Sequence, residues 1–177
     1  MGDLLERAVD AARLTELLVV RHPGVQVAAV DVLDDTSGSA NRLRLGLAYE
    51  DGADAGLPPT MFLKRNLERF SFPVAMYTTE VRMYRDVLPG TRVEAPAVYA
   101  IAATGDDVEF TILMEDLAGR PDVRIGFVLD PTTPDEVDSL LATLARLHAA
   151  FWGGGRIDRR APWAQAPAED SAMRFWA

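Results

Sequence analysis

Among the residues that could do chemistry, Lys64 stands out because it is the only lysine among the 18 lysine and arginine residues of the chain. It follows the apolar segment Met61-Phe62-Leu63, which has the character of a short strand. Lysine carries a compact point charge, whereas arginine carries a wide planar fork. A compact ammonium on a strand can contact phosphate oxygens when a carboxylate on a nearby helix steers it. A phosphate-binding lysine is one interpretation of Lys64, and the alternative is a strand-end lysine whose ammonium reaches solvent. The location alone does not decide between them, so the order of the surrounding elements has to.

Glu80 is the predicted carboxylate. Apolar residues recur at three- and four-residue intervals through the segment Phe70–Leu88, which predicts a helix. Glu80 lies three residues after Tyr77 and four before Tyr84, so its side chain belongs to the buried side of that helix. A charge on a buried side needs a partner, because unpaired burial is expensive. Lys64 is the nearest candidate; in the alternative, Glu80 lies at the helix boundary and reaches water.

The elements that must position this pair form an α+β pattern with a five-stranded antiparallel sheet. A polar turn at 34–41 joins the first two strands, and a loop at 50–59 leads to the lysine strand. Consecutive antiparallel strands are the simplest topology. The expected strands are 25–33, 42–49, 60–65, 96–102 and 109–114, and the expected helices are 3–20, 70–88 and one that starts after Thr133.

The start of this last helix is the best-specified local signal in the chain. Thr133-Pro134-Asp135-Glu136 has the capping-box arrangement, with proline at the first helical position and acidic residues in the first turn. The apolar pattern continues to Trp152, and a run of three glycines from Gly153 predicts an abrupt end. His148 lies on the apolar face and is predicted to be a buried core histidine rather than a catalytic one.

The composition bounds the class of protein. The net charge of −9 argues against nonspecific nucleic-acid binding, and the absence of cysteine excludes disulfides and thiolate chemistry. No uninterrupted apolar stretch is long enough to cross a bilayer. We therefore expect a soluble cytoplasmic protein that binds neither nucleic acid nor membrane.

The ordered set of segments resembles the N-terminal lobe of the aminoglycoside phosphotransferase and choline-kinase-like superfamily, which has the protein-kinase-like fold. The ecdysteroid-kinase-like branch is the most similar. The likeness covers about residues 14 to 155, and the segments that carry it are Ser37-Gly38-Ser39-Ala40-Asn41-Arg42, Phe62-Leu63-Lys64, Glu80, Leu113-Met114-Glu115-Asp116-Leu117 and Leu144-Ala145-Arg146-Leu147-His148-Ala149-Ala150-Phe151-Trp152-Gly153.

The resemblance implies roles for individual residues. Lys64 would contact the α- and β-phosphates of ATP, and Glu80 would hold it in place. The other residues expected to contact the nucleotide are Ser37, Gly38, Ser39 and Asn41 over the phosphates, Phe62 as the adenine roof, Met114 at the back of the adenine pocket, and the backbone of Glu115 and Leu117 at the adenine edge. Taken without the resemblance, the turn at 37–41 is a polar hairpin turn with one glycine.

One departure from the family concerns catalysis. Phosphoryl transfer needs a carboxylate that orients the acceptor hydroxyl and ligands for Mg²⁺, which the family supplies from a His-x-Asp loop and a later Asp. Here His22 is followed by Pro-Gly and His148 by Ala-Ala, so this loop is missing. The simplest explanation is a sequence that stops before the loop. The expected cofactors are ATP and Mg²⁺, the latter with ligands outside this chain.

These observations lead to three hypotheses. In the first, the chain is the front part of an ATP-dependent kinase of small-molecule hydroxyl groups, inactive alone, with a nucleotide-binding lobe at 1–117 and, at 118–177, a hinge, a connector and the first helix of a helical lobe. In the second, it is a kinase-like binding or regulatory module, and uncovered apolar residues such as Leu141, Leu144 and Phe151 meet a partner. In the third, it is a plain α+β domain in which Lys64 and Glu80 never meet.

Overall fold

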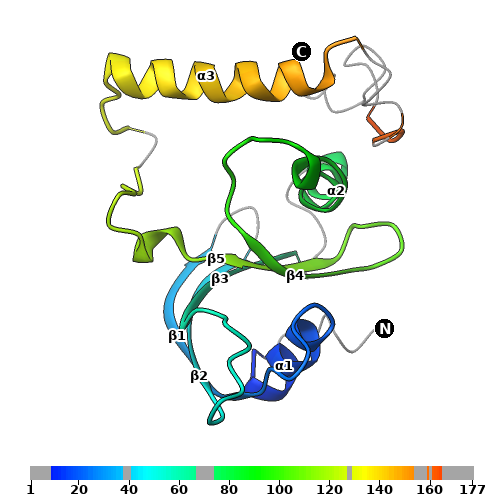
Figure 1. The fold of residues 1–177 in the computed structure, drawn as a ribbon, viewed down its shortest axis with the longest axis vertical. Helices are drawn as coiled ribbons and strands as arrows, with labels where there is room; N and C mark the ends of the chain where they lie inside the picture. The colour runs from blue at the N-terminus through cyan, green and yellow to red at the C-terminus, as the bar shows by residue number, and fades with distance from the viewer. Residues whose placement is uncertain are drawn as a thin grey trace. The chain divides into compact units, whose positions relative to one another are not determined.

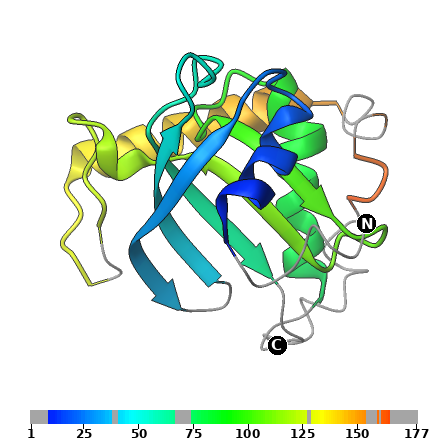
Figure 2. The same ribbon diagram turned by 90° about the horizontal axis from the view of Figure 1, so that it is seen from below.

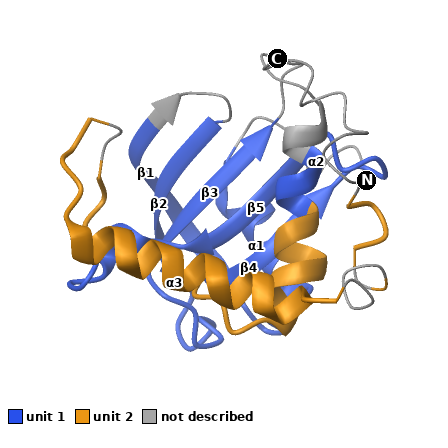
Figure 3. Cartoon of the chain, turned by 90° about the horizontal axis from the view of Figure 1, so that it is seen from above, with its two compact units in different colours: residues 1–81, 96–123 blue, residues 82–95, 124–177 orange. Residues whose placement is uncertain are grey.

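A computed structural model describes residues 9–37, 41–66, 74–126, 129–153, 159 and 161–164, with no placement of the side chains of 36–37 and 74–77 (Figure 1). The chain divides into two compact units (Figure 3). The first comprises residues 1–81 and 96–123, and the second comprises residues 82–95 and 124–177. The sequence-based division at residue 117 and this grouping differ in the assignment of 118–123 and of 82–95.

The first unit is built on one antiparallel sheet of five strands in the order β1-β2-β3-β5-β4. This confirms the predicted α+β class and the five-stranded antiparallel sheet. The strand that carries Lys64 is central, with β2 on one side and β5 on the other. The bounds are β1 Val27–Ser37, β2 Asn41–Tyr49, β3 Thr60–Asn66, β4 Val98–Ala103 and β5 Phe110–Glu115.

The first strand is longer than predicted. Residues 34–37 were expected in a polar turn, but they continue β1 and pair with β2 as far as Ser37 opposite Asn41. Asp34 lies opposite Arg44, and opposite charges on paired strands stabilise a sheet. The polar composition of these residues therefore marks a solvated strand end rather than a turn. Residues 38–40 of the expected turn lie outside the described residues.

A hydrophobic core fills the space between one face of the sheet and α1, Ala11–Val19 (Figure 2). Asp10 caps this helix by accepting a hydrogen bond from the Arg13 N–H at 2.9 Å. The helix was expected from residue 3; it begins after this cap, and residues 3–8 lie outside the described part. The core residues from the helix and the sheet are Leu14, Leu17, Leu18, Leu43, Leu45, Leu47, Met61, Leu63, Ala100 and Leu113.

The opposite face of the sheet carries α2, Val74–Arg82 (Figure 1). Side chains alternate along β3, so Leu63 points toward the α1 core while Phe62 and Lys64 point to the α2 side. Phe110 and Ile112 of β5 lie opposite Asn66 and Lys64 of β3, so they belong to the same face of the sheet, and both are fully buried. The sheet therefore separates a purely apolar face from a face that mixes apolar and charged residues.

In the second unit, a single π-helical turn, Met83–Val87, and a 3₁₀ turn, Leu88–Gly90, replace the last part of the expected helix 70–88. Pro89 has no N–H to continue an α-helical ladder, which accounts for the change at this end. Residues 70–73 of the expected helix lie outside the described part.

The longest helix of the second unit is α3, Pro134–Phe151. The predicted capping box at Thr133 is confirmed, and Gly153 adopts φ +90°, the left-handed conformation that ends a helix. No residue of α3 is buried: Leu140 and Leu141 are 60% and 56% exposed. The prediction of a buried His148 is wrong, because this residue is exposed as well. Among the described residues, no helix combines the length and apolarity needed to cross a bilayer.

The capping box predicts a pH dependence for α3. The Thr133 N–H donates to Glu136 at 2.8 Å and Arg124 donates to the same carboxylate at 2.5 Å, which lowers the pKa of Glu136 from 4.5 to about 2. A carboxyl group whose pKa is lower in the folded state stabilises that state above its unfolded pKa. This contribution should be present above pH 4.5 and disappear as the pH falls toward 2.

Carbon-detected NMR titration of the Glu136 carboxyl group checks this expectation. The Glu136→Gln variant is the matched control, since its amide keeps a capping oxygen but does not titrate. The amide shifts of the helix start should show a step near pH 2 in the wild type that is missing in the variant. A wild-type Glu136 that titrates at 4.5 would contradict the role given to the capping box.

Candidate functional site

The structure brings Lys64 and Glu80 together. The ammonium Nζ of Lys64 on β3 lies 2.6 Å from Oε1 of Glu80 on α2. Both side chains are partly buried, with 22% and 26% of their surface exposed. Lys64 is therefore not a strand-end lysine extended into solvent, and the carboxylate of Glu80 is paired with Lys64 instead of being solvated only by water.

The geometry of this pair leaves the ammonium able to bind another anion. An ammonium has three N–H donors, and the 2.6 Å contact uses one carboxylate oxygen. Glu80 restricts where the flexible lysine side chain can point, and a charge-assisted hydrogen bond of this length is a strong restraint. The pair therefore presents a positioned positive charge at the surface of the central strand.

The register of the sheet places further candidate residues beside this charge. Arg42 lies directly opposite Lys64, and Arg44 lies directly opposite Phe62, across β2 and β3. Phe62 in turn lies opposite Met114 across β3 and β5. Opposed residues of an antiparallel pair share a face, so these five side chains belong to the face that carries α2. Phe62 is half-buried and Met114 is 5% exposed.

Asp116, a member of the segment 113–117 to which the sequence analysis assigned no role of its own, fixes the segment that leaves β5. Its carboxylate accepts a hydrogen bond from Nε of Arg44 at 2.7 Å and another from the N–H of Ala118 at 3.2 Å. The Asp116 side chain is 3% exposed and that of Arg44 is 35% exposed. The pair ties the 3₁₀ turn Leu117–Gly119 to β2, so the predicted adenine edge has a side-chain brace. In the sequence, Arg44 could be recognised as a charged residue on the polar side of β2, but the pattern did not indicate which acidic residue it pairs with.

Replacing Asp116 with alanine should lower the free energy of unfolding by about 1–3 kcal/mol, because the Arg44 guanidinium and the Ala118 N–H lose a buried acceptor. Urea unfolding of the two proteins measures the difference. Asp122→Ala is the matched control: Asp122 also pairs with an arginine, Arg120, at 2.9 Å, but its side chain is 65% exposed. The control should cost much less, because an exposed ion pair contributes little to stability. Equal costs for the two variants would show that the brace contributes nothing.

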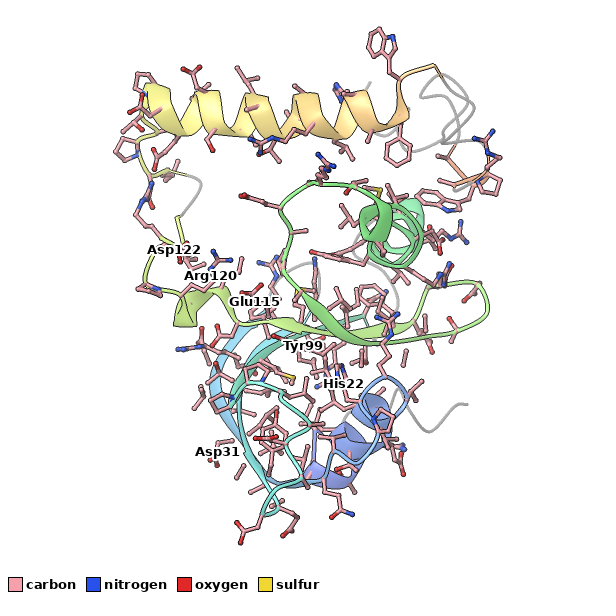
Figure 4. All side chains as sticks on the ribbon, viewed as in Figure 1. His22, Asp31, Tyr99, Glu115, Arg120 and Asp122 are labelled. Carbon is pink, nitrogen blue, oxygen red and sulfur yellow. The ribbon has the colours of Figure 1, made fainter. Side chains whose placement is uncertain are left out.

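Glu115 is held on both its backbone and its side chain. Its N–H donates to the carbonyl of Ala97 at 2.8 Å, and its Oε2 accepts the Ala97 N–H at 3.1 Å. Its Oε1 lies 3.6 Å from Nη1 of Arg120, and Figure 4 shows the two side chains next to each other. Because the Glu115 N–H is already used, a ligand that meets the backbone of Glu115 at the predicted adenine edge would have to use its carbonyl oxygen.

The Glu115 carboxylate also affects a neighbouring tyrosine. Burial, and then the charge of Glu115, raises the pKa of Tyr99.

The remaining predicted contacts are placed only in part. Asn41 begins β2, opposite Ser37 and Arg65, while Gly38 and Ser39 lie outside the described residues. Leu117 begins the 3₁₀ turn that Asp116 caps. Within the described part of the chain, no group of three or more His, Asp or Glu side chains is arranged to hold a metal ion.

Comparison with known proteins adds no relative: the chain matches no protein-family model and no curated protein.

Proposed function

We propose that the chain is the nucleotide-binding N-terminal lobe of an ATP-dependent phosphotransferase that acts on a hydroxyl group of a small molecule. The observation that carries this proposal is the 2.6 Å ion pair between Lys64 and Glu80, which joins the central strand of the sheet to the helix on its mixed face. In phosphoryl transfer the protein contributes chiefly positioning and electrostatic stabilisation, and a lysine held by a helix carboxylate supplies both.

The chemistry of the neighbouring residues fits a nucleotide. Lys64 would contact the α- and β-phosphates, and Phe62 and Met114 would supply an apolar surface for the adenine ring on the same face. The Glu115 carbonyl and the Leu117 N–H would form the hydrogen bonds to the adenine edge. Asp116 would hold that edge in place through Arg44.

This role is one of binding rather than of complete turnover. Neither His22 nor His148 begins a His-x-Asp sequence, so none of these 177 residues is assigned to the orientation of the acceptor hydroxyl. Mg²⁺, when bound with ATP, would neutralise phosphate charge, and its protein ligands are not assigned here. Lys64 and Glu80 would act on the nucleotide by fixing its phosphates.

Isothermal titration calorimetry of the purified chain with ATP, in the presence of Mg²⁺, tests the proposal. We expect binding of one ATP per chain that weakens as the salt concentration rises, because the phosphates bind to charged groups. Adenosine should bind more weakly than ATP. No heat at millimolar ATP, or equal binding of adenosine and ATP, would refute a phosphate site at Lys64.

The exposed apolar residues of α3 favour a second candidate function, a kinase-like module that binds a protein partner. Val137, Leu140, Leu141 and Leu144 are each more than 40% exposed, whereas Phe151 is half-buried. Light scattering with and without ATP separates the two functions. Self-association together with a failure to bind ATP would favour the binding module, and a monomer that binds ATP would favour the nucleotide-binding lobe.

A further inference from the structure

We propose that Arg42 is a second phosphate-binding cation beside Lys64, so that the site selects nucleotides with two or more phosphates over monophosphates. This inference rests on the proposed nucleotide site. It gives a role to a residue for which the sequence analysis named no individual function.

The register of β2 and β3 puts Arg42 next to Lys64. The two residues are direct partners in the antiparallel pairing, so their Cβ atoms lie about 4.5–5.5 Å apart on one face of the sheet. Leu43 and Leu45, which alternate with Arg42 on β2, point into the core on the other face. Arg42 and Lys64 therefore start from one point of the sheet and extend on the side of α2.

The Arg42 side chain carries an unsatisfied donor. Its Nε is buried and has no hydrogen-bond partner among the residues that the structure describes. Two residues farther along the same strand face, the Nε of Arg44 donates to Asp116 at 2.7 Å, so an equivalent group nearby is satisfied. Buried polar groups in folded proteins are nearly always paired, and an exception calls for a missing ligand or water. A phosphate oxygen would satisfy this donor if the Arg42 side chain turned toward the ligand on binding.

The charges around the pair also favour a bound anion. Like charges directly opposite each other on paired strands destabilise a sheet. Glu80 offsets the charge of Lys64, and within the described part of the chain no such carboxylate meets the Nε of Arg42. The guanidinium is a planar fork that can donate two hydrogen bonds to one phosphate, whereas the ammonium acts as a point charge. The two cations therefore suit different phosphates of one polyphosphate chain.

Calorimetric titration of wild type, Arg42→Gln and Arg42→Lys with ATP, with AMP and with inorganic tripolyphosphate tests this inference. Arg42→Gln should weaken ATP and tripolyphosphate binding about tenfold or more, which corresponds to one charged hydrogen bond, and change AMP binding less than about threefold. Arg42→Lys should recover part of the loss. Arg21→Gln is the matched control: Arg21 is exposed beyond the end of α1, and its loss should leave all three affinities unchanged.

A melting curve separates this role from a structural one. Arg42→Gln should unfold at the same temperature as wild type or higher, because it removes an unsatisfied buried donor, while the thermal shift on adding ATP should shrink. Unchanged ATP affinity in Arg42→Gln, with wild-type binding intact, would overturn the inference alone. Tripolyphosphate binding that depends on Arg42, without ATP binding, would support Arg42 as a phosphate-binding cation but overturn both the nucleotide selectivity and the proposed function. If wild type bound neither ligand, both would be overturned.

Discussion

Replacing Lys64 with alanine should weaken ATP binding about 10- to 100-fold, which corresponds to the loss of about 1.5–3 kcal/mol from a hydrogen bond to a charged group. Lys64→Arg should restore only part of this affinity, because a planar fork cannot occupy the place of a point charge 2.6 Å from Glu80. Calorimetric titration of the three proteins with ATP measures the effect.

Glu80→Gln supplies the control for this comparison. The amide keeps the size and hydrogen-bonding capacity of the carboxylate but loses its charge, so the ammonium is less firmly positioned. We expect an affinity between those of wild type and Lys64→Ala. Equal affinities for wild type, Lys64→Ala and Lys64→Arg would show that the lysine has no part in nucleotide binding.

Replacing Leu45 with alanine should lower the free energy of unfolding by about 2–5 kcal/mol, because it removes a large side chain from the centre of the core. Leu45 is fully buried in the layer between α1 and the sheet. Urea unfolding followed by circular dichroism measures the difference. A loss of this size is a large share of the stability of a typical domain.

Leu33→Ala is the matched control, because it makes the same substitution on the neighbouring strand at a residue that is 50% exposed. It should cost less than about 1 kcal/mol. If the two variants were destabilised equally, the α1 layer could not be the main apolar core of the first unit.

Local patterns predicted the main elements of the fold well. Alternation in the segment 42–49 anticipated the buried face of β2, with Leu43, Leu45 and Leu47 buried, since the period of a strand is fixed at two residues. The capping residues Thr133 and Glu136 marked the start of α3 because the bonds of a capping box span only three residues. The helical phase of Glu80 placed its carboxylate on the buried side of the helix, and the order of the elements made Lys64 the nearest candidate partner, which the ion pair confirms.

Features that depend on distant residues could not be predicted in the same way. The Arg44–Asp116 pair joins residues 72 positions apart, and several other acidic residues were equally plausible partners from the sequence. The position of Arg42 beside Lys64 depends on the strand register, and its unsatisfied Nε depends on burial. The exposure of His148 was missed because an apolar helix face indicates a contact surface without showing whether it is covered.

Because Lys64 is the only lysine, a lysine-directed reagent can test the central claim at one site. An acyl-phosphate derivative of ATP transfers its acyl group to an amine close to the bound phosphates and releases ATP. Peptide mass spectrometry then separates acylated Lys64 from the acylated N-terminal amine. The phosphate-binding role of Lys64 predicts acylation of Lys64 that excess ATP suppresses more strongly than the same concentration of adenosine. Acylation of the N-terminus alone, or acylation of Lys64 that excess ATP leaves unchanged, would contradict it.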